Sequence, residues 1–174
     1  MEPSLITETS GGVAVAEPPT AVASLHLNQL QALAPAELDE LCAQFAVRSP
    51  GGRNRHHQIV DLVRAALSRG TPVTVEGFYD QVADSFGLLR FPALNFLPVP
   101  EEVGIPRGTT QRFRFRLGQL ISGTVRLPRD REKSLMLDEV TAIEGNPVAE
   151  WQELTEFDNL TPLYPEGRIF LENT

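Results

Sequence analysis

The stretch DSFGLLRF, residues 84 to 91, combines an aromatic ring, a glycine and an arginine at strand-like spacing. Phe86 and Leu88 share one face of an extended strand, because side chains alternate with a period of two. An aromatic ring can stack on a nucleobase, and the guanidinium of Arg90 can bind a base edge or a phosphate. Such platforms usually carry two or three aromatic rings, and only Phe86 is aromatic here. The stretch is therefore either a nucleic-acid-binding strand or a strand that kept the shape and lost the contacts.

A basic segment lies in the middle of an otherwise acidic chain. The net charge is −8, but residues 86–134 carry eight arginines and one lysine against four acids, which gives +5. The flanks are acidic, with −6 over residues 1–47 and −8 over residues 135–174. Because salt screens charges beyond about 8–10 Å, attraction for phosphates depends on this local charge more than on the total. The alternative is that the arginines are solvated residues of strand edges.

Within this segment, arginines and apolar residues alternate in the order Arg112, Phe113, Arg114, Phe115, Arg116 and Leu117. This period of two predicts one basic face and one apolar face. Arg112 is therefore a candidate nucleic-acid contact. The alternative is that Phe86, Leu88 and Phe113 are simply barrel core and that the arginines are surface residues.

Catalytic or metal chemistry has no support in the sequence. His56 and His57 are adjacent, so on a helix they point in different directions, and no further ligand spacing accompanies them. Cys42 lies on an apolar helical stripe, which favours a core residue over a nucleophile. The pair Glu101 and Glu102 is of a kind common on loops, and the phosphate-loop pattern G-x-x-x-x-G-K-[ST] is absent. We expect no cofactor.

The bulk composition is that of a soluble globular protein. The chain has 174 residues, of which 41% are hydrophobic and 22% charged. This length suffices for one domain or two small ones. One cysteine excludes an internal disulfide, and neither a membrane-spanning run nor a secretory signal is found. We expect a cytoplasmic protein.

The N-terminal part is predicted to be a tail followed by short helices. Residues 1–24 are rich in Ser, Thr, Gly, Pro and Ala and predict a disordered tail. Residues 25–70 show helical periodicity, with Pro35 suited to a first helical turn and Asn54 to an N-cap. The expected apolar stripes are Leu38, Leu41, Cys42 and Phe45, and then Ile59, Val60, Val63 and Leu67.

From about residue 73 the period changes to two, which predicts strands. Residues 73–145 fit a five-stranded Greek-key barrel of the OB type, so the expected fold class is α+β. Residues 146–174 are acidic and interrupted by prolines, which predicts an extended connector. The expected strands are 77–83, 86–91, 102–105, 120–127 and 134–143.

Four stretches resemble the N-terminal region of the bacterial transcription termination factor Rho family. They are LNQLQALAPAELDEL, DSFGLLR, QRFRFRLGQLISGTVRLP and FDNLTPLYPEGRIFLE. The last is the most specific, since a generic OB barrel gives no reason for NLTPLYPE. The resemblance implies a helical subdomain, a cold-shock-like OB barrel that binds single-stranded pyrimidine-rich RNA, and a connector toward an ATPase domain.

The resemblance also carries the family's RNA site onto residues of this chain. The first aromatic and the arginine of the strand motif are present as Phe86 and Arg90, and the acidic positions as Glu102 and Glu132. The remaining aromatic positions fall on Leu88, Gly104 and Ser134. Three of four stacking rings are therefore missing. Since each stack is worth roughly 1–3 kcal/mol, this loss predicts weakened binding.

The resulting function is an RNA-binding module of Rho-dependent termination with no ATPase activity in this chain. RNA is the expected partner, with Rho or RNA polymerase as possible protein partners and a hexamer only if an ATPase domain follows. The alternative is a protein that does not bind RNA and contacts Rho or the transcription machinery. The missing aromatics and acidic flanks favour the alternative, whereas Arg90, Glu102 and Glu132 favour RNA.

Overall fold

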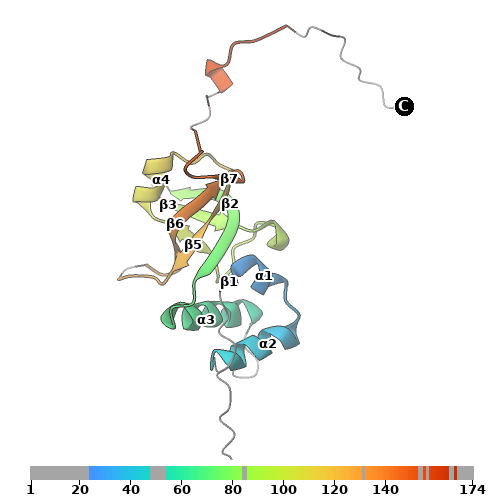
Figure 1. The fold of residues 1–174 in the computed structure, drawn as a ribbon. Helices are drawn as coiled ribbons and strands as arrows, with labels where there is room; N and C mark the ends of the chain where they lie inside the picture. Colours follow the sequence, from blue (N-terminus) through green and yellow to red (C-terminus); the bar gives the residue numbers. More distant parts are fainter. Residues whose placement is uncertain are drawn as a thin grey trace, which may run out of the picture. The chain divides into compact units, whose positions relative to one another are not determined.

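The computed structural model describes residues 24–47, 54–83, 86–130, 132–152, 155, 157–164 and 167. The chain divides into two compact units, residues 1–74 and residues 75–174. In their described parts, the first contains three helices and the second a closed β-barrel (Figure 1). The expected α+β fold with a five-stranded OB-like barrel is confirmed. The predicted tail lies outside the described residues except for Ser24, as does much of the predicted connector.

The helical unit contains α1 (Leu27–Ala32), α2 (Pro35–Gln44) and α3 (Arg55–Ser68). The predicted start signals are used. Pro35 is the first residue of α2, and Asn54 caps α3 by accepting the backbone N–H of His56 at 3.1 Å. Such caps satisfy N–H groups that have no partner within the helix.

One apolar face of each helix is buried. Ile59 and Val63 are fully buried as predicted, but Leu41 and Leu67 are only half-buried. Leu62, which the predicted stripe omitted, is fully buried. The core of this unit comprises Leu27, Leu30, Leu38, Cys42, Ile59, Leu62, Val63 and Ala66.

Two arginines hold the C-terminal ends of the helices. The Arg55 guanidinium donates to the carbonyls of Leu30 at 3.3 Å and Gln31 at 3.1 Å, and also to that of Leu33. Arg69 donates to the carbonyl of Gln44 at 3.1 Å. The last carbonyls of a helix lack intrahelical partners and carry partial negative charge, so cations there are stabilising. These two basic residues therefore have structural partners.

The barrel is built from five strands, each close to its predicted range. They are β2 (Val73–Ala83), β3 (Phe86–Arg90), β4 (Val103–Ile105), β5 (Leu120–Arg126) and β6 (Leu135–Ile143). The strand order is β2-β3-β4-β6-β5, and β5 pairs back with β2 to close the barrel. The pairs β2–β3, β3–β4 and β5–β6 are antiparallel, whereas β4 and β6 run parallel. Two short strands extend the sheet, β1 (Leu25–His26) beside the start of β2 and β7 (Asn146–Pro147) beside β6.

Position 87, in the FGLLR strand, must be a glycine for a steric reason. Gly87 pairs with Gln81 on one side and Ile105 on the other. A Cβ at this position would lie 2.3 Å from Cε2 of Tyr79, whose ring is buried. Only glycine leaves room for that ring. Other buried residues of the barrel are Val75, Leu89, Phe91, Val103, Ile105, Ile121, Val125, Leu135, Leu137 and Ile143.

The alternating arginine and apolar residues 112–117, which were expected to give one basic and one apolar face, begin inside a helix and form no strand. Residues Arg107–Phe113 form a helix, α4, and Arg114 ends it with a left-handed backbone at φ 48°. The apolar residues nevertheless gather. The rings of Phe113 and Phe115 are stacked with their centres 5.4 Å apart, and the centre of the Phe115 ring lies 5.5 Å from that of Tyr79. Local packing of these rings has outweighed the period of two.

Candidate nucleic-acid interface

A pocket opens over β3 and β4, which here is named the β3–β4 pocket. It has a volume of about 550 Å³. The lining residues are Phe86, Leu88, Glu102, Pro106, Arg107, Glu132, Lys133, Ser134 and Met136. In OB barrels the second and third strands, with the loop between the fourth and fifth, form the usual oligonucleotide surface. Those elements correspond here to β3, β4 and the described residues 127–130 and 132–134 between β5 and β6.

Five of the eight predicted site residues line this pocket. Antiparallel pairing sets Leu88 on β3 opposite Gly104 on β4. Phe86, at the start of β3, is 36% exposed and supplies the exposed aromatic surface of the lining. Leu88 is only 8% exposed, so little of its side chain is available to a ligand. Glu102 begins the β4 side, and Glu132 and Ser134 come from the loop before β6. Residues far apart in the sequence are thus brought together.

The space above Gly104 is occupied by two side chains from neighbouring strands. A Cβ on Gly104 would lie 2.9 Å from Cζ of Phe86 and 2.7 Å from Sδ of Met136. Glycine therefore lets the Phe86 ring and the Met136 thioether cover β4 at this point. Met136 was not predicted from the sequence, because only the pairing of β4 with β6 brings it over Gly104.

Arg90 and Glu102 are paired with each other. Arg90 Nη1 donates to Glu102 Oε1, and Arg90 Nε donates to Asp80 Oδ2 at 3.0 Å. Glu102 Oε1 also accepts the backbone N–H of Val99 at 3.1 Å. Both paired side chains are mostly buried, at 16% and 17% exposure. The guanidinium plane is therefore fixed, and an arginine has further N–H donors beyond these two bonds.

Glu132 is held by Arg126 and by the loop backbone. Its two carboxylate oxygens accept from Arg126 at 2.7 and 2.8 Å, and one also accepts the backbone N–H of Arg129 at 2.7 Å. The Arg126 hydrogen bonds, followed by that from Arg129, lower the pKa of Glu132 from 4.5 to about 2. The hydrogen bonds between the Arg126 and Glu132 side chains also raise the pKa of Arg126. This bidentate pair closes the loop that borders the pocket.

Two exposed cations stand at the rim of the pocket. Arg107 begins α4, and Lys133 lies between Glu132 and Ser134. Neither was singled out from the sequence, since a lone cation in a basic segment carries no distinctive spacing. Their positive charges lie beside a largely apolar cavity, an arrangement that suits an anionic ligand.

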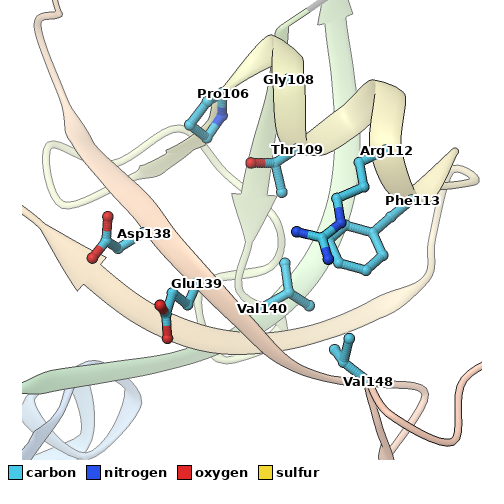
Figure 2. A pocket seen from close by; sticks show the side chains of 9 residues that line it. All are labelled: Pro106, Gly108, Thr109, Arg112, Phe113, Asp138, Glu139, Val140 and Val148. Atoms are coloured by element: carbon cyan, nitrogen blue, oxygen red, sulfur yellow. The ribbon is translucent and has the colours of Figure 1, made fainter.

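Arg112 lies elsewhere. Figure 2 shows its side chain lying along Phe113 in a second pocket of about 470 Å³, between α4 and β6. Its guanidinium carbon is 5.1 Å from the Phe113 ring centre, a cation–π distance. Asp138 and Glu139 of β6 line the same pocket, so the local charge is not purely basic. The structure therefore does not bring Arg112 to the other predicted residues.

Other chemistry finds little support in the described part of the chain. There the His, Cys, Asp and Glu side chains form no cluster of three or more that could hold a metal ion. Cys42 is buried, and burial, reinforced by Asp39 and Asp61, raises the pKa of its thiol. Such a thiol is a poor nucleophile. Each described helix is too short or too polar to span a bilayer.

Comparison with known proteins identifies relatives of this barrel. Residues 75–149 match the family described as Rho termination factor, RNA-binding domain. The chain is 29% identical over 148 residues to transcription termination factor Rho of Cereibacter sphaeroides, and 31% identical over 148 residues to Rho 1 of Ehrlichia chaffeensis. Each alignment covers 85% of this chain and 35% of the relative.

A third relative extends the match along the chain. Rho of Akkermansia muciniphila is 27% identical over 175 residues, which covers 99% of this chain and 37% of that protein. The chain thus spans about a third of the length of these curated relatives. The resemblance to the N-terminal region of Rho is confirmed.

Proposed function

Because residues 75–149 belong to the RNA-binding domain family of Rho termination factors, we propose that the β3–β4 pocket binds single-stranded, pyrimidine-rich RNA. In the proposed complex a base stacks on Phe86 while the Arg90–Glu102 pair meets its Watson–Crick edge. The observation that carries this proposal is the gathering of Phe86, Glu102, Glu132 and Ser134 around one cavity on the oligonucleotide face of an OB barrel.

The proposed binding is weaker than that of a site with four stacking rings. Phe86 is exposed, but Leu88 is nearly buried and Gly104 and Ser134 carry no ring. Each missing stack removes roughly 1–3 kcal/mol, and about 4 kcal/mol separates a micromolar from a millimolar interaction. The biological setting we propose is transcription termination, where this chain contributes RNA binding and not ATP hydrolysis.

The test is fluorescence anisotropy of the whole chain with a labelled oligocytidine at low salt. Phe86→Ala should weaken binding by about 1–3 kcal/mol, since it removes the exposed ring. Val82→Ala is the matched control, because Val82 is an exposed apolar residue of β2 that lines none of the pockets described. Equal affinity of parent and Phe86→Ala would contradict the proposed site.

A second candidate function rests on the internal pairing of the polar residues. Arg90, Glu102 and Glu132 are all engaged in ion pairs within the chain, which a purely structural role would also produce. The corresponding function is a protein that contacts Rho or RNA polymerase without binding RNA. Absence of oligocytidine binding even at low salt would select this function, and pull-down with purified Rho and RNA polymerase would then identify the partner.

A further inference from the structure

A third pocket of the barrel adjoins the β3–β4 pocket and has no assigned role. It has a volume of about 460 Å³ and is named here the Phe96 pocket. The residues that line it are Phe78, Tyr79, Asp80, Arg90, Phe96, Leu117 and Gly118. They come from β2, β3, the loop after β3 and the loop before β5.

The main aromatic surface of this pocket is an exposed ring held in an unusual backbone. Phe96 is 51% exposed and packs edge-on against Phe78, with ring centres 5.7 Å apart at 72°. Asn95 and Phe96 both have positive φ, 52° and 59°. Backbone hydrogen bonds to Pro92 and Phe91, each 3.0 Å, hold this conformation. A bulky residue rarely adopts positive φ, and such residues cluster at ligand sites.

Arg90 joins the two pockets. Its Nε atom pairs with Asp80, which lines the Phe96 pocket, and its Nη1 atom pairs with Glu102, which lines the β3–β4 pocket. The ion pairs therefore form a common wall. A single strand with one base in the β3–β4 pocket would cross this wall and place a base further along the strand, which a dinucleotide does not supply, in the Phe96 pocket.

The polar groups of the Phe96 pocket suit a particular class of base. Asp80 has 43% of its side chain exposed, and a carboxylate offers more acceptor sites than its one bond to Arg90 uses. Carboxylates accept hydrogen bonds from the exocyclic amino group of cytosine, which uracil lacks. The combination of an exposed ring, a carboxylate and a guanidinium distinguishes this pocket from a purely apolar protein-docking patch.

We propose that the Phe96 pocket is a second nucleobase subsite, in which the base stacks on Phe96 and donates its exocyclic amino group to Asp80. This proposal rests on the proposed function, because it requires that the β3–β4 pocket binds RNA. It assigns a preference for cytosine over uracil to residues outside the site carried over from the Rho family. It also supplies an aromatic stack where Leu88, Gly104 and Ser134 supply none.

The experiment compares affinities of whole-chain variants for a cytidine dinucleotide and for an oligocytidine of about eight nucleotides. Phe96→Ala should weaken binding of the oligocytidine on the order of tenfold and leave the dinucleotide unaffected. Phe96→Leu should lose as much, since it keeps an apolar side chain but removes the ring, and Phe96→Trp should retain full affinity. Leu97→Ala is the matched control, because Leu97 is the adjacent residue, is 61% exposed and does not line the pocket.

The base preference gives a second arm. Asp80→Asn, which retains an acceptor oxygen but loses the charge paired with Arg90, should reduce the ratio of oligocytidine to oligouridine affinity. Circular dichroism would confirm that each variant is folded. An unchanged ratio in a folded Asp80→Asn variant would overturn the assignment of Asp80.

The outcomes separate this inference from the function beneath it. If Phe86→Ala weakens oligocytidine binding and Phe96→Ala does not, the second subsite is wrong and the proposed function stands. If the parent binds no RNA, both fall together. If Phe96→Ala leaves RNA affinity unchanged but abolishes self-association or capture of a purified protein partner, the pocket is a protein-docking surface and the nucleobase assignment is overturned.

Discussion

At Gly104 the absence of a side chain determines what covers the pocket floor. The Phe86 ring and the Met136 thioether approach the position that a Cβ would take, at 2.9 and 2.7 Å. A larger residue there must displace both. Ser134 differs, since it lies at the pocket edge and half-exposed. Gly104 and Ser134, two of the positions onto which the resemblance to the family carries an aromatic ring, are therefore not equivalent in this chain.

Ser134→Tyr should strengthen binding of oligocytidine by about 1–3 kcal/mol, because it adds a ring facing the base that stacks on Phe86. Gly104→Tyr should lower the melting temperature instead, because its Cβ would clash with Phe86 and Met136. Anisotropy and thermal melting of both variants check the contrast. Stronger binding by a fully stable Gly104→Tyr variant would show that Phe86 and Met136 move aside easily.

The pairing of Glu132 with Arg126 should make part of the stability depend on pH. The pKa of Glu132 is lowered from 4.5 to about 2, so its carboxylate stabilises the fold above pH 4.5 and this contribution is lost as pH falls toward 2. Glu132→Gln should therefore be less stable than the parent near neutral pH, by on the order of 1 kcal/mol after allowance for solvent exposure.

Urea denaturation of both proteins between pH 6 and about pH 2 measures this difference, which should shrink on acidification. Glu150→Gln is the control, since Glu150 is exposed and remote from Arg126 in sequence. A difference that persists unchanged at the acid end would mean that the ion pair is not its source.

At the scale of elements, two leucines that lie within one turn of α2 differ in how deeply they are buried. Leu38 is 1% exposed, whereas Leu41 is half-buried. Helical periodicity predicted that Leu38 and Leu41 lie on the same apolar stripe. The spacing of the residues does not show how much of that stripe is buried against the neighbouring helix. The packing of α2 against α3 decides which leucine enters the core.

Leu38→Ala should cost about 2–5 kcal/mol of unfolding free energy, since it leaves a cavity in the core of the helical unit. Leu41→Ala on the same helix serves as the matched comparison and should cost clearly less. Thermal and urea melts monitored by circular dichroism measure both. Equal losses would indicate that the two side chains are buried alike.

How far the sequence predicts the structure also differs between elements. The five barrel strands were predicted within a few residues because a period of two bounded by Gly, Pro and Asp is a strong signal. Helix α4 was missed because it is short and shows no helical spacing of apolar residues, and its last two residues begin the alternating run over 112–117. The two-residue strand β1 has no periodicity to detect. Among site residues, Gly104 and Ser134 carry no chemistry of their own and could be found only through resemblance to the family. Arg126 and Met136 required the fold, which alone sets them beside Glu132 and Phe86.

At the scale of the whole molecule, charge is distributed so that the barrel face differs from the rest of the chain. Residues 86–134 carry +5 in a protein of net charge −8. Several of these cations are engaged within the fold, as Arg90 and Arg126 are. The rim cations Arg107 and Lys133 are exposed beside the pocket and are the candidates for phosphate contacts.

Binding of oligocytidine should therefore weaken with added salt. If Arg107 and Lys133 each contact one phosphate, a fourfold rise in salt should lower affinity about sevenfold. Arg107→Ala and Lys133→Ala should each flatten this dependence, and Arg64→Ala, an exposed position of α3, should leave it unchanged. A salt slope that is the same in all three variants would exclude these rim contacts.

The closure of the barrel has a consequence for the order in which the protein can fold. Strand β4 pairs with β6, with Val103 opposite Leu135, and a side-chain hydrogen bond of 3.0 Å joins Ser122 to Glu76 across 46 positions. Contacts between such distant segments form slowly, typically within milliseconds to seconds, whereas local helices form in microseconds. During synthesis, β2, β3 and β4 must therefore wait with an unpaired edge until β6 has left the ribosome. In that interval the growing chain is most prone to aggregate, and a chaperone would be most useful to it.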